Sequence, residues 1–166
     1  MTLASPGRAT ARPNPRTLAA SDGVFSLPAL VPTEMSFDSD GLDGQVALIT
    51  GASSGIGEAT AEALAGEGAS VALAARREDE LRSLADRIES EGGETLVVPT
   101  DVTDEEQVRE MVEETVDEFG RLDVLVNNAG VMLLERVAEA DTDDWRRMVE
   151  VNLLGLMNAT HAALPH

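Results

Sequence analysis

The sequence predicts an α/β fold, a doubly wound parallel sheet with helices on both faces. From Leu42 onward, short apolar runs alternate with stretches of helical periodicity, the order expected of strand–helix–strand units. The apolar runs are unbroken, which is typical of parallel strands buried on both faces. With right-handed crossovers, four such strands have the spatial order 3-2-1-4.

Four apolar runs predict the strands, at residues 46–49, 70–75, 95–98 and 122–126. Pro99 closes the third strand, and Asp123 interrupts the fourth near its start. The fold is expected to be truncated after the fourth strand and the helix that follows it. The fourth strand is then expected to have an exposed edge.

Glycines delimit the first two helical stretches. The first begins near Gly55 and ends at Gly66 and Gly68. Its expected apolar face holds Ile56, Ala59, Ala63 and Leu64. The second stops at Gly92, and its apolar residues follow the spacing i, i+3, i+4, i+7: Leu81, Leu84, Ala85 and Ile88.

Capping signals open the other two helical stretches. Thr103 and Glu106 have the spacing of a capping box, and Gly120 ends the helix that they begin. Its apolar stripe is Val108, Met111, Val112, Thr115, Val116 and Phe119. Asp141 or Thr142 is expected to cap the last helix, which contains Trp145 and continues toward the terminus.

The composition is acidic and lacks both cysteine and lysine. The formal net charge is −19, and all 12 basic residues are arginine. A field of that sign repels nucleic acid and anionic membrane surfaces, and no apolar stretch is long enough to span a bilayer. The absence of cysteine excludes disulfides and thiolate metal sites and is consistent with a cytoplasmic protein. The acidity is either that of an ordinary acidic protein or, as we favour, a halophilic adaptation to high salt.

Residues 1–40 differ in composition from the remainder. They hold five prolines and three arginines and show no lasting period of 2 or 3.6, which predicts a disordered extension. The Arg-rich start weakly resembles an organelle transit peptide. Alternatively, Met35 is the true first residue and the upstream part is mis-annotated.

Residues 46–57 combine a strand, a glycine-rich turn and the start of a helix. Unpaired backbone N–H groups and the helix dipole converge there, which favours an anion. The candidate ligand is the pyrophosphate of a dinucleotide, and the alternative is an ordinary turn and helix start. The candidate binding residues of this segment are Gly51, Ser53, Ser54, Gly55, Ile56 and Gly57.

Four motifs in this order resemble the short-chain dehydrogenase/reductase family. Residues 50–57, Thr-Gly-Ala-Ser-Ser-Gly-Ile-Gly, are similar to its cofactor loop, Thr-Gly-x-x-x-Gly-x-Gly. Asp101-Val102 follows the third strand, Asn127-Asn128-Ala129-Gly130 the fourth, and Val151-Asn152 lies in the next helix. The resemblance covers residues 42–166. It implies a Rossmann fold, with an incomplete NADP-binding domain at residues 41–166.

The resemblance also implies roles for these motifs. Asp101 and Val102 are expected at the adenine edge, although Asp101 also suits the approach to a helix. Asn128, Ala129 and Gly130 are expected to stabilise the central sheet and to pass along the ribose of the cofactor. Asn152 is the one catalytic residue of the family's set found here, holding a water in a proton relay; a surface residue or a helix–helix hydrogen bond is its alternative.

The end of the second strand predicts which dinucleotide binds. NAD-dependent enzymes usually have a carboxylate there for the ribose 2′-hydroxyl, whereas this chain has Ala75 followed by Arg76 and Arg77. A guanidinium binds a 2′-phosphate in a bidentate manner, so NADP is expected in preference to NAD, with Arg76 first and Arg77 second. Alternatively, both arginines begin a solvated helix and pair with Glu80 and its neighbours.

The family's chemistry needs a Tyr, a Lys and a Ser beyond the helix asparagine. This chain contains neither Tyr nor Lys. We therefore expect a fragment of an oxidoreductase that transfers a hydride between NADP and an alcohol or carbonyl substrate, inactive as it stands. The alternative is a non-catalytic nucleotide-binding or dimerising module. The resemblance implies a homo-oligomer with contacts around the Asn152 helix.

Overall fold

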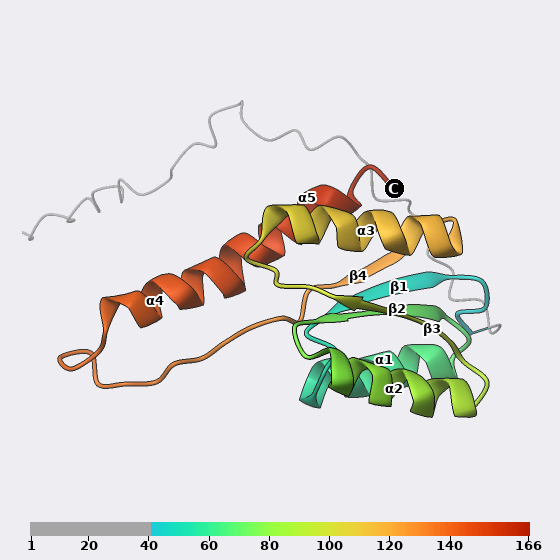
Figure 1. Cartoon of the computed structure of the whole chain (residues 1–166), viewed down its shortest axis with the longest axis horizontal. Coiled ribbons are helices and arrows are strands. Elements are labelled where there is room, and N and C mark those ends of the chain that lie inside the picture. Colours follow the sequence, from blue (N-terminus) through green and yellow to red (C-terminus); the bar gives the residue numbers. More distant parts are fainter. Residues whose placement is uncertain (1–40) are drawn as a thin grey trace, which may run out of the picture. The chain divides into compact units, whose positions relative to one another are not determined.

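The computed structural model describes residues 41–166. The expectations for residues 1–40, a disordered extension or a mis-annotated start, lie outside the described part, and the domain boundary at residue 41 stays a prediction. The described chain forms one parallel sheet of four strands in the order β3-β2-β1-β4, which confirms the predicted topology (Figure 1). The strands are β1 (Val46–Thr50), β2 (Ser70–Ala75), β3 (Glu94–Pro99) and β4 (Val124–Val126).

The centre of the sheet is apolar apart from Thr50 at the carboxyl end of β1. Leu48 of β1 lies opposite Ala72 of β2 and Leu125 of β4 in parallel register. All five residues of β1 are buried, so this strand has no solvent-facing side. That explains its unbroken apolar run, because both of its faces are covered by helices.

Helices cover each face of the sheet. On one side lie α1 (Gly55–Gly66) and α2 (Glu78–Ser90), and on the other lie α3 (Glu105–Phe119) and α5 (Leu156–Ala163) (Figure 1). Successive strand residues serve opposite cores, since Ile49 and Leu73 pack with α2 whereas Leu48 and Ala72 pack with α3. The predicted stripes of the second and third helices are confirmed as these contacts.

The predicted apolar face of α1 is only partly right: of its four residues, Leu64 is half-buried and packs against the core. Ile56 is 79% exposed, and Ala59 and Ala63 are exposed as well. The buried residues of the helix are Gly57 and Ala61. The first turn of the helix lies very close to the backbone that follows β1, which leaves no room for a side chain at Gly57.

The predicted capping box at the start of α3 is wrong. Asp104 is the N-cap residue, and its carboxylate accepts hydrogen bonds from the backbone N–H groups of Glu106 and Gln107. The Thr103 hydroxyl donates instead to Asp101. Aspartate caps a helix as well as threonine does, so moving the N-cap from Thr103 to Asp104 does not reduce the stability of the helix start. Gly120 ends α3 in a left-handed conformation, as predicted.

The last helical stretch is interrupted rather than continuous. It consists of α4 (Thr142–Val149), the π-helical segment η1 (Glu150–Gly155) and α5. Asp141 caps α4 by accepting from the backbone N–H of Asp143, one of the two predicted alternatives. Within residues 41–166, no helix combines the length and the apolar character needed to span a bilayer.

Candidate functional site

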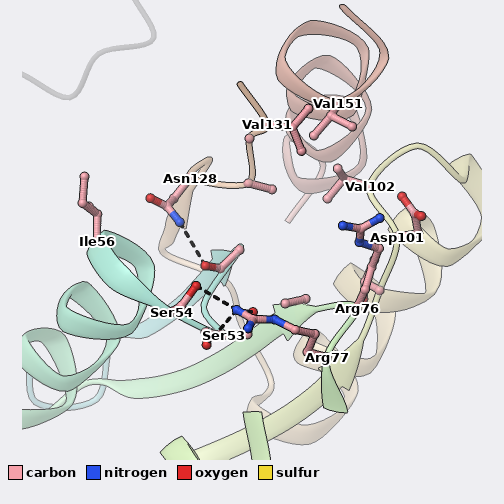
Figure 2. Close-up of a pocket in the computed structure, with 15 residues that line it drawn as sticks. Ser53, Ser54, Ile56, Arg76, Arg77, Asp101, Val102, Asn128, Val131 and Val151 are labelled. Carbon is pink, nitrogen blue, oxygen red and sulfur yellow. Dashed lines mark hydrogen bonds between the residues drawn. The ribbon is translucent and has the colours of Figure 1, made fainter. Parts of the chain in front are cut away.

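A cleft of about 360 Å³ lies at the carboxyl ends of the strands (Figure 2). Every predicted cofactor-binding residue lines it except Gly55 and Gly57, and Asn152 does not line it. Four further residues, which the sequence did not single out as a site, complete the lining: Ala75, Thr100, Val131 and Val151. The strand ends therefore bring together residues from four separate segments of the chain.

Gly57 is needed for packing at the base of the cleft. A Cβ atom at this position would collide with the carbonyl oxygen of Gly51 and with the side-chain amide of Asn128. That amide donates to the carbonyl oxygens of Thr50 and Gly51, at 3.1 Å each. Figure 2 shows the bond to Gly51. Asn128 thus ties the segment after β4 to the glycine-rich turn after β1.

Thr50 begins the motif of residues 50–57 but is not among the predicted site residues, and the structure gives it a linking role. Its buried hydroxyl accepts from the backbone N–H groups of Asn128 and Ala129, both at 3.1 Å, and donates to the carbonyl oxygen of Val126 at 3.3 Å. One hydroxyl at the end of β1 therefore orders the backbone of the loop that follows β4. Its position at the end of a buried strand, just before the glycine-rich turn, is the available sequence signal.

The N-terminus of α1 opens into the cleft without a side-chain cap. Ser54 is its N-cap residue, yet its hydroxyl makes no capping hydrogen bond, whereas Asp104 and Asp141 cap α3 and α4. No atom lies within 4 Å of the place where a Cβ would stand on Gly55. The first turn of α1 therefore offers backbone donors and the positive end of its dipole to an anion.

Two arginines follow β2 at the side of the cleft and make different contacts. Arg77 donates to the Ser53 hydroxyl at 2.9 Å, to the Ser54 hydroxyl at 2.8 Å and to the Ser53 carbonyl oxygen at 3.2 Å (Figure 2). The guanidinium of Arg76 lies on the other side, near the carboxylate of Asp101 (Figure 2). Neither arginine makes an ion pair with a carboxylate of residues 41–166, so the proposed pairing with Glu80 is absent there.

Asp101 is held in its charged form. Burial alone would raise its pKa, but four favourable effects outweigh it: the hydrogen bonds from the Thr103 N–H and hydroxyl, at 3.0 and 2.8 Å, and the positive charges of Arg76 and Arg147. The pKa of Asp101 therefore lies below its ordinary value of 3.8. Two roles are predicted for Asp101, a contact with the adenine edge and a place in the approach to a helix. Both are compatible with its position, because Asp101 lines the cleft and also accepts from the Thr103 N–H in the turn that leads into α3.

Asn152 lies behind the cleft rather than in its wall. Its side-chain oxygen accepts from the Val131 N–H, and its amide donates to the Val131 carbonyl oxygen, both at 2.8 Å. The residue is exposed, in contrast to the apolar setting expected from its neighbours. Asn152 thus fixes the backbone that leaves the cleft after β4, and its proposed catalytic part stays a prediction.

The π-helical segment brings this helix close to the third strand's end. A Cβ on Gly155 would lie 2.8 Å from the Val102 Cγ2 atom, so only glycine allows this approach. Val102 is 8% exposed and lines the cleft together with Val151. The apolar wall of the cleft therefore depends on a glycine within η1.

The parallel sheet and the cleft at its carboxyl edge define a Rossmann-type domain. A family model described as short chain dehydrogenase matches residues 45–166. The chain belongs to the short-chain dehydrogenase/reductase family of oxidoreductases.

Individual relatives agree with this assignment. The chain is 47% identical over 124 residues to a glycine betaine reductase of Emericella nidulans, covering 75% of this chain and 10% of that protein. It is 44% identical over 127 residues to an uncharacterised oxidoreductase of Staphylococcus saprophyticus, covering 75% of this chain and 53% of the relative. It also resembles an alcohol dehydrogenase of the archaeon Thermococcus sibiricus, solved in complex with 5-hydroxy-NADP. That structure matches with a TM-score of 0.71 and 42% identity, over 73% of this chain and 52% of the other. The chain thus spans about half the length of the latter two relatives.

Proposed function

We propose that the cleft binds NADP in preference to NAD. One observation carries this proposal: the end of β2 offers Ala75 and two arginines where an NAD site places a carboxylate. A carboxylate there would repel a 2′-phosphate, whereas a guanidinium attracts and hydrogen-bonds it.

The residues present fit this cofactor. The uncapped start of α1 suits the pyrophosphate, and the serine hydroxyls beside Arg77 are donors at the same edge of the cleft. Val102 and Val151 supply an apolar wall for a planar base, with the Asp101 carboxylate as acceptor for an exocyclic amine. Of the two arginines, Arg76 makes no ion pair or side-chain hydrogen bond within residues 41–166, whereas Arg77 bonds to Ser53 and Ser54. This division supports Arg76 as the first phosphate ligand.

The relatives support the same reading of the whole protein's chemistry. The Thermococcus sibiricus neighbour is named an alcohol dehydrogenase and carries an NADP derivative. We infer an oxidoreductase that acts on an alcohol or carbonyl group, for which the nicotinamide nucleotide supplies or accepts the hydride. Cytoplasmic location and homo-oligomerisation around the Asn152 helix remain predictions made from composition and resemblance.

The absence of Tyr and Lys favours a second candidate for the chain as it stands. Without either side chain, residues 1–166 lack the proton donor and the partner cation that the family's chemistry uses. The chain by itself is then a nucleotide-binding module. Incubation with NADPH and a panel of aldehydes and ketones distinguishes the two, since turnover would exclude the binding-only role.

The cofactor preference is tested by Arg76→Asp. We expect this variant to lose affinity for NADPH and to shift the NADPH/NADH affinity ratio toward NADH, because it places a carboxylate near the ribose. Arg82→Asp is the matched control: it makes the same charge change on α2, where Arg82 is ion-paired with Glu78 and exposed. An unchanged ratio in Arg76→Asp would refute the assignment.

We also propose that the acidic surface is an adaptation to high salt. Helix α3 alone carries seven carboxylates in 15 residues, with Arg109 as its only cation. Their mutual repulsion weakens when counterions screen it. A series of melting curves against KCl tests this proposal.

A further inference from the structure

A glutamine in the first turn of α3 braces the turn that carries Asp101. That turn leads from β3 into α3, and its residues Asp101 and Val102 line the cleft (Figure 2). Gln107 is half-buried; its Oε1 atom accepts from the Asp101 N–H at 3.0 Å, and its Nε2 atom donates to the Asp104 carboxylate at 2.9 Å. One side chain therefore joins the two ends of the turn.

This contact differs from an ordinary capping box. A glutamine at this helix position usually reaches back to the backbone N–H of the N-cap residue. Here the N-cap is Asp104, and its N–H donates to the Asp101 carbonyl oxygen at 3.0 Å. Gln107 reaches three residues further, to a residue of the cleft wall.

The partners of the Gln107 amide fix its orientation. A backbone N–H only donates, and an ionised carboxylate only accepts, so the amide oxygen must face Asp101 and the amide nitrogen must face Asp104. An apolar side chain at position 107 would lose both bonds. A glutamate would set a second carboxylate against that of Asp104. The brace therefore requires a neutral amide.

The carboxylate of Asp101 is divided between the turn and the cleft. Its Oδ1 atom accepts from the Thr103 N–H and hydroxyl, at 3.0 and 2.8 Å. Its Oδ2 atom makes no hydrogen bond within residues 41–166, so it is available to a ligand. Since the backbone N–H and carbonyl oxygen of Asp101 also have partners, the position of this available oxygen is fixed.

We propose that Gln107 is a positioning residue of the nucleotide site: by holding the Asp101 N–H, it keeps the carboxylate where it distinguishes adenine from other bases. The inference rests on the proposed function, in which Asp101 accepts from the exocyclic amine of adenine. Hypoxanthine has a carbonyl oxygen in place of that amine, and a fixed carboxylate repels it. A loosely held carboxylate discriminates less, because it turns away from the oxygen.

The test compares the Kd of NADPH with that of its hypoxanthine analogue. We expect the unmodified chain to bind NADPH about tenfold more tightly than the analogue, and Gln107→Met to reduce that ratio to about threefold or less. Gln107→Glu should reduce it as well. Gln45→Met is the matched control: Gln45 is half-buried beyond the amino end of β1, opposite the cleft, and its side chain makes no hydrogen bond within the described residues. Its ratio should be that of the unmodified chain.

The ratio separates positioning from a merely structural role. A general loss of stability weakens the binding of both nucleotides alike and leaves their ratio unchanged. In the Asp101→Asn background, Gln107→Met should change the ratio far less than it does alone, because the carboxylate is gone. An unmodified chain that binds both nucleotides equally, unaltered ratios in both Gln107 variants, or an equal change in Gln45→Met would overturn the inference while nucleotide binding stands. No binding of NADPH by the unmodified chain would overturn the proposed function itself, which is a distinct result.

Discussion

The side-chain amide of Asn152 pairs with both backbone polar groups of Val131, at 2.8 Å for each hydrogen bond. The amide thus acts as a short piece of backbone, joining a helix to the loop that leaves β4. Since Val131 lines the cleft, the shape of the cleft depends on a residue that does not line it.

Removing that amide should loosen this loop. We expect Asn152→Ala to lower the free energy of unfolding by about 1 kcal/mol, because Val131 then loses both partners. Nucleotide affinity should fall with it. Urea denaturation measures the first effect and a fluorescence titration the second. Asn158→Ala is the control, since the Asn158 side chain makes no hydrogen bond within the described residues; equal losses in both variants would contradict this account.

The close packing at Gly57 gives a second prediction. Gly57→Ala should destabilise the chain by about 1–3 kcal/mol, because the added methyl group meets the Gly51 carbonyl oxygen and the Asn128 amide. Gly66→Ala, in the same helix, has open space around its Cβ and should be neutral or stabilising by up to about 1 kcal/mol. Thermal melts of the two variants check the contrast, and similar melting temperatures would refute it.

Asp101 gives a prediction about pH. Its pKa is lower in the folded chain than its ordinary value, so the charged form stabilises the fold at pH values above about 4. That contribution should disappear as the pH falls through the folded-state pKa. Asp101→Asn removes the titrating group, so the stability gap between wild type and variant should narrow in acid. A gap that stays constant from neutral pH to pH values below the folded-state pKa would contradict the lowered pKa.

Salt should stabilise the chain through its acidic helices. We expect the melting temperature to rise between low salt and about 2 M KCl by at least the roughly 4 °C that corresponds to about 1 kcal/mol. Replacing Glu114 and Asp117 on α3 by Lys should reduce that dependence, because both are exposed and carry charge of the same sign. A melting temperature independent of KCl would exclude the adaptation.

The sequence predicts the strand order and most of the buried helix faces better than it predicts the close contacts between elements. Strand order and the buried stripes of α2 and α3 follow from apolar periodicity, which is a strong local signal. The packed face of α1 follows only in part, because Gly57 faces inward for lack of space and not for hydrophobicity. The π-helical segment leaves no such signal either, and neither does the close approach of its Gly155 to Val102, which is a tertiary contact.

The candidate site shows a similar division. Motifs correctly indicate most of the cleft lining, since they lie where parallel strands end. They do not reveal which side chain bonds to which: Thr50 as the link between the end of β1 and the loop that follows β4, and Arg77 as a partner of Ser53 and Ser54, come from the three-dimensional arrangement.

The central claim is that this cleft prefers NADP, and direct titration of the unmodified chain tests it. Isothermal calorimetry with NADPH and with NADH, under the same salt and pH, gives the two dissociation constants. We predict that NADPH binds at least about tenfold more tightly, as expected for a phosphate that gains charge-assisted hydrogen bonds from an arginine. Equal affinities, tighter binding of NADH, or no binding of either nucleotide would contradict the account.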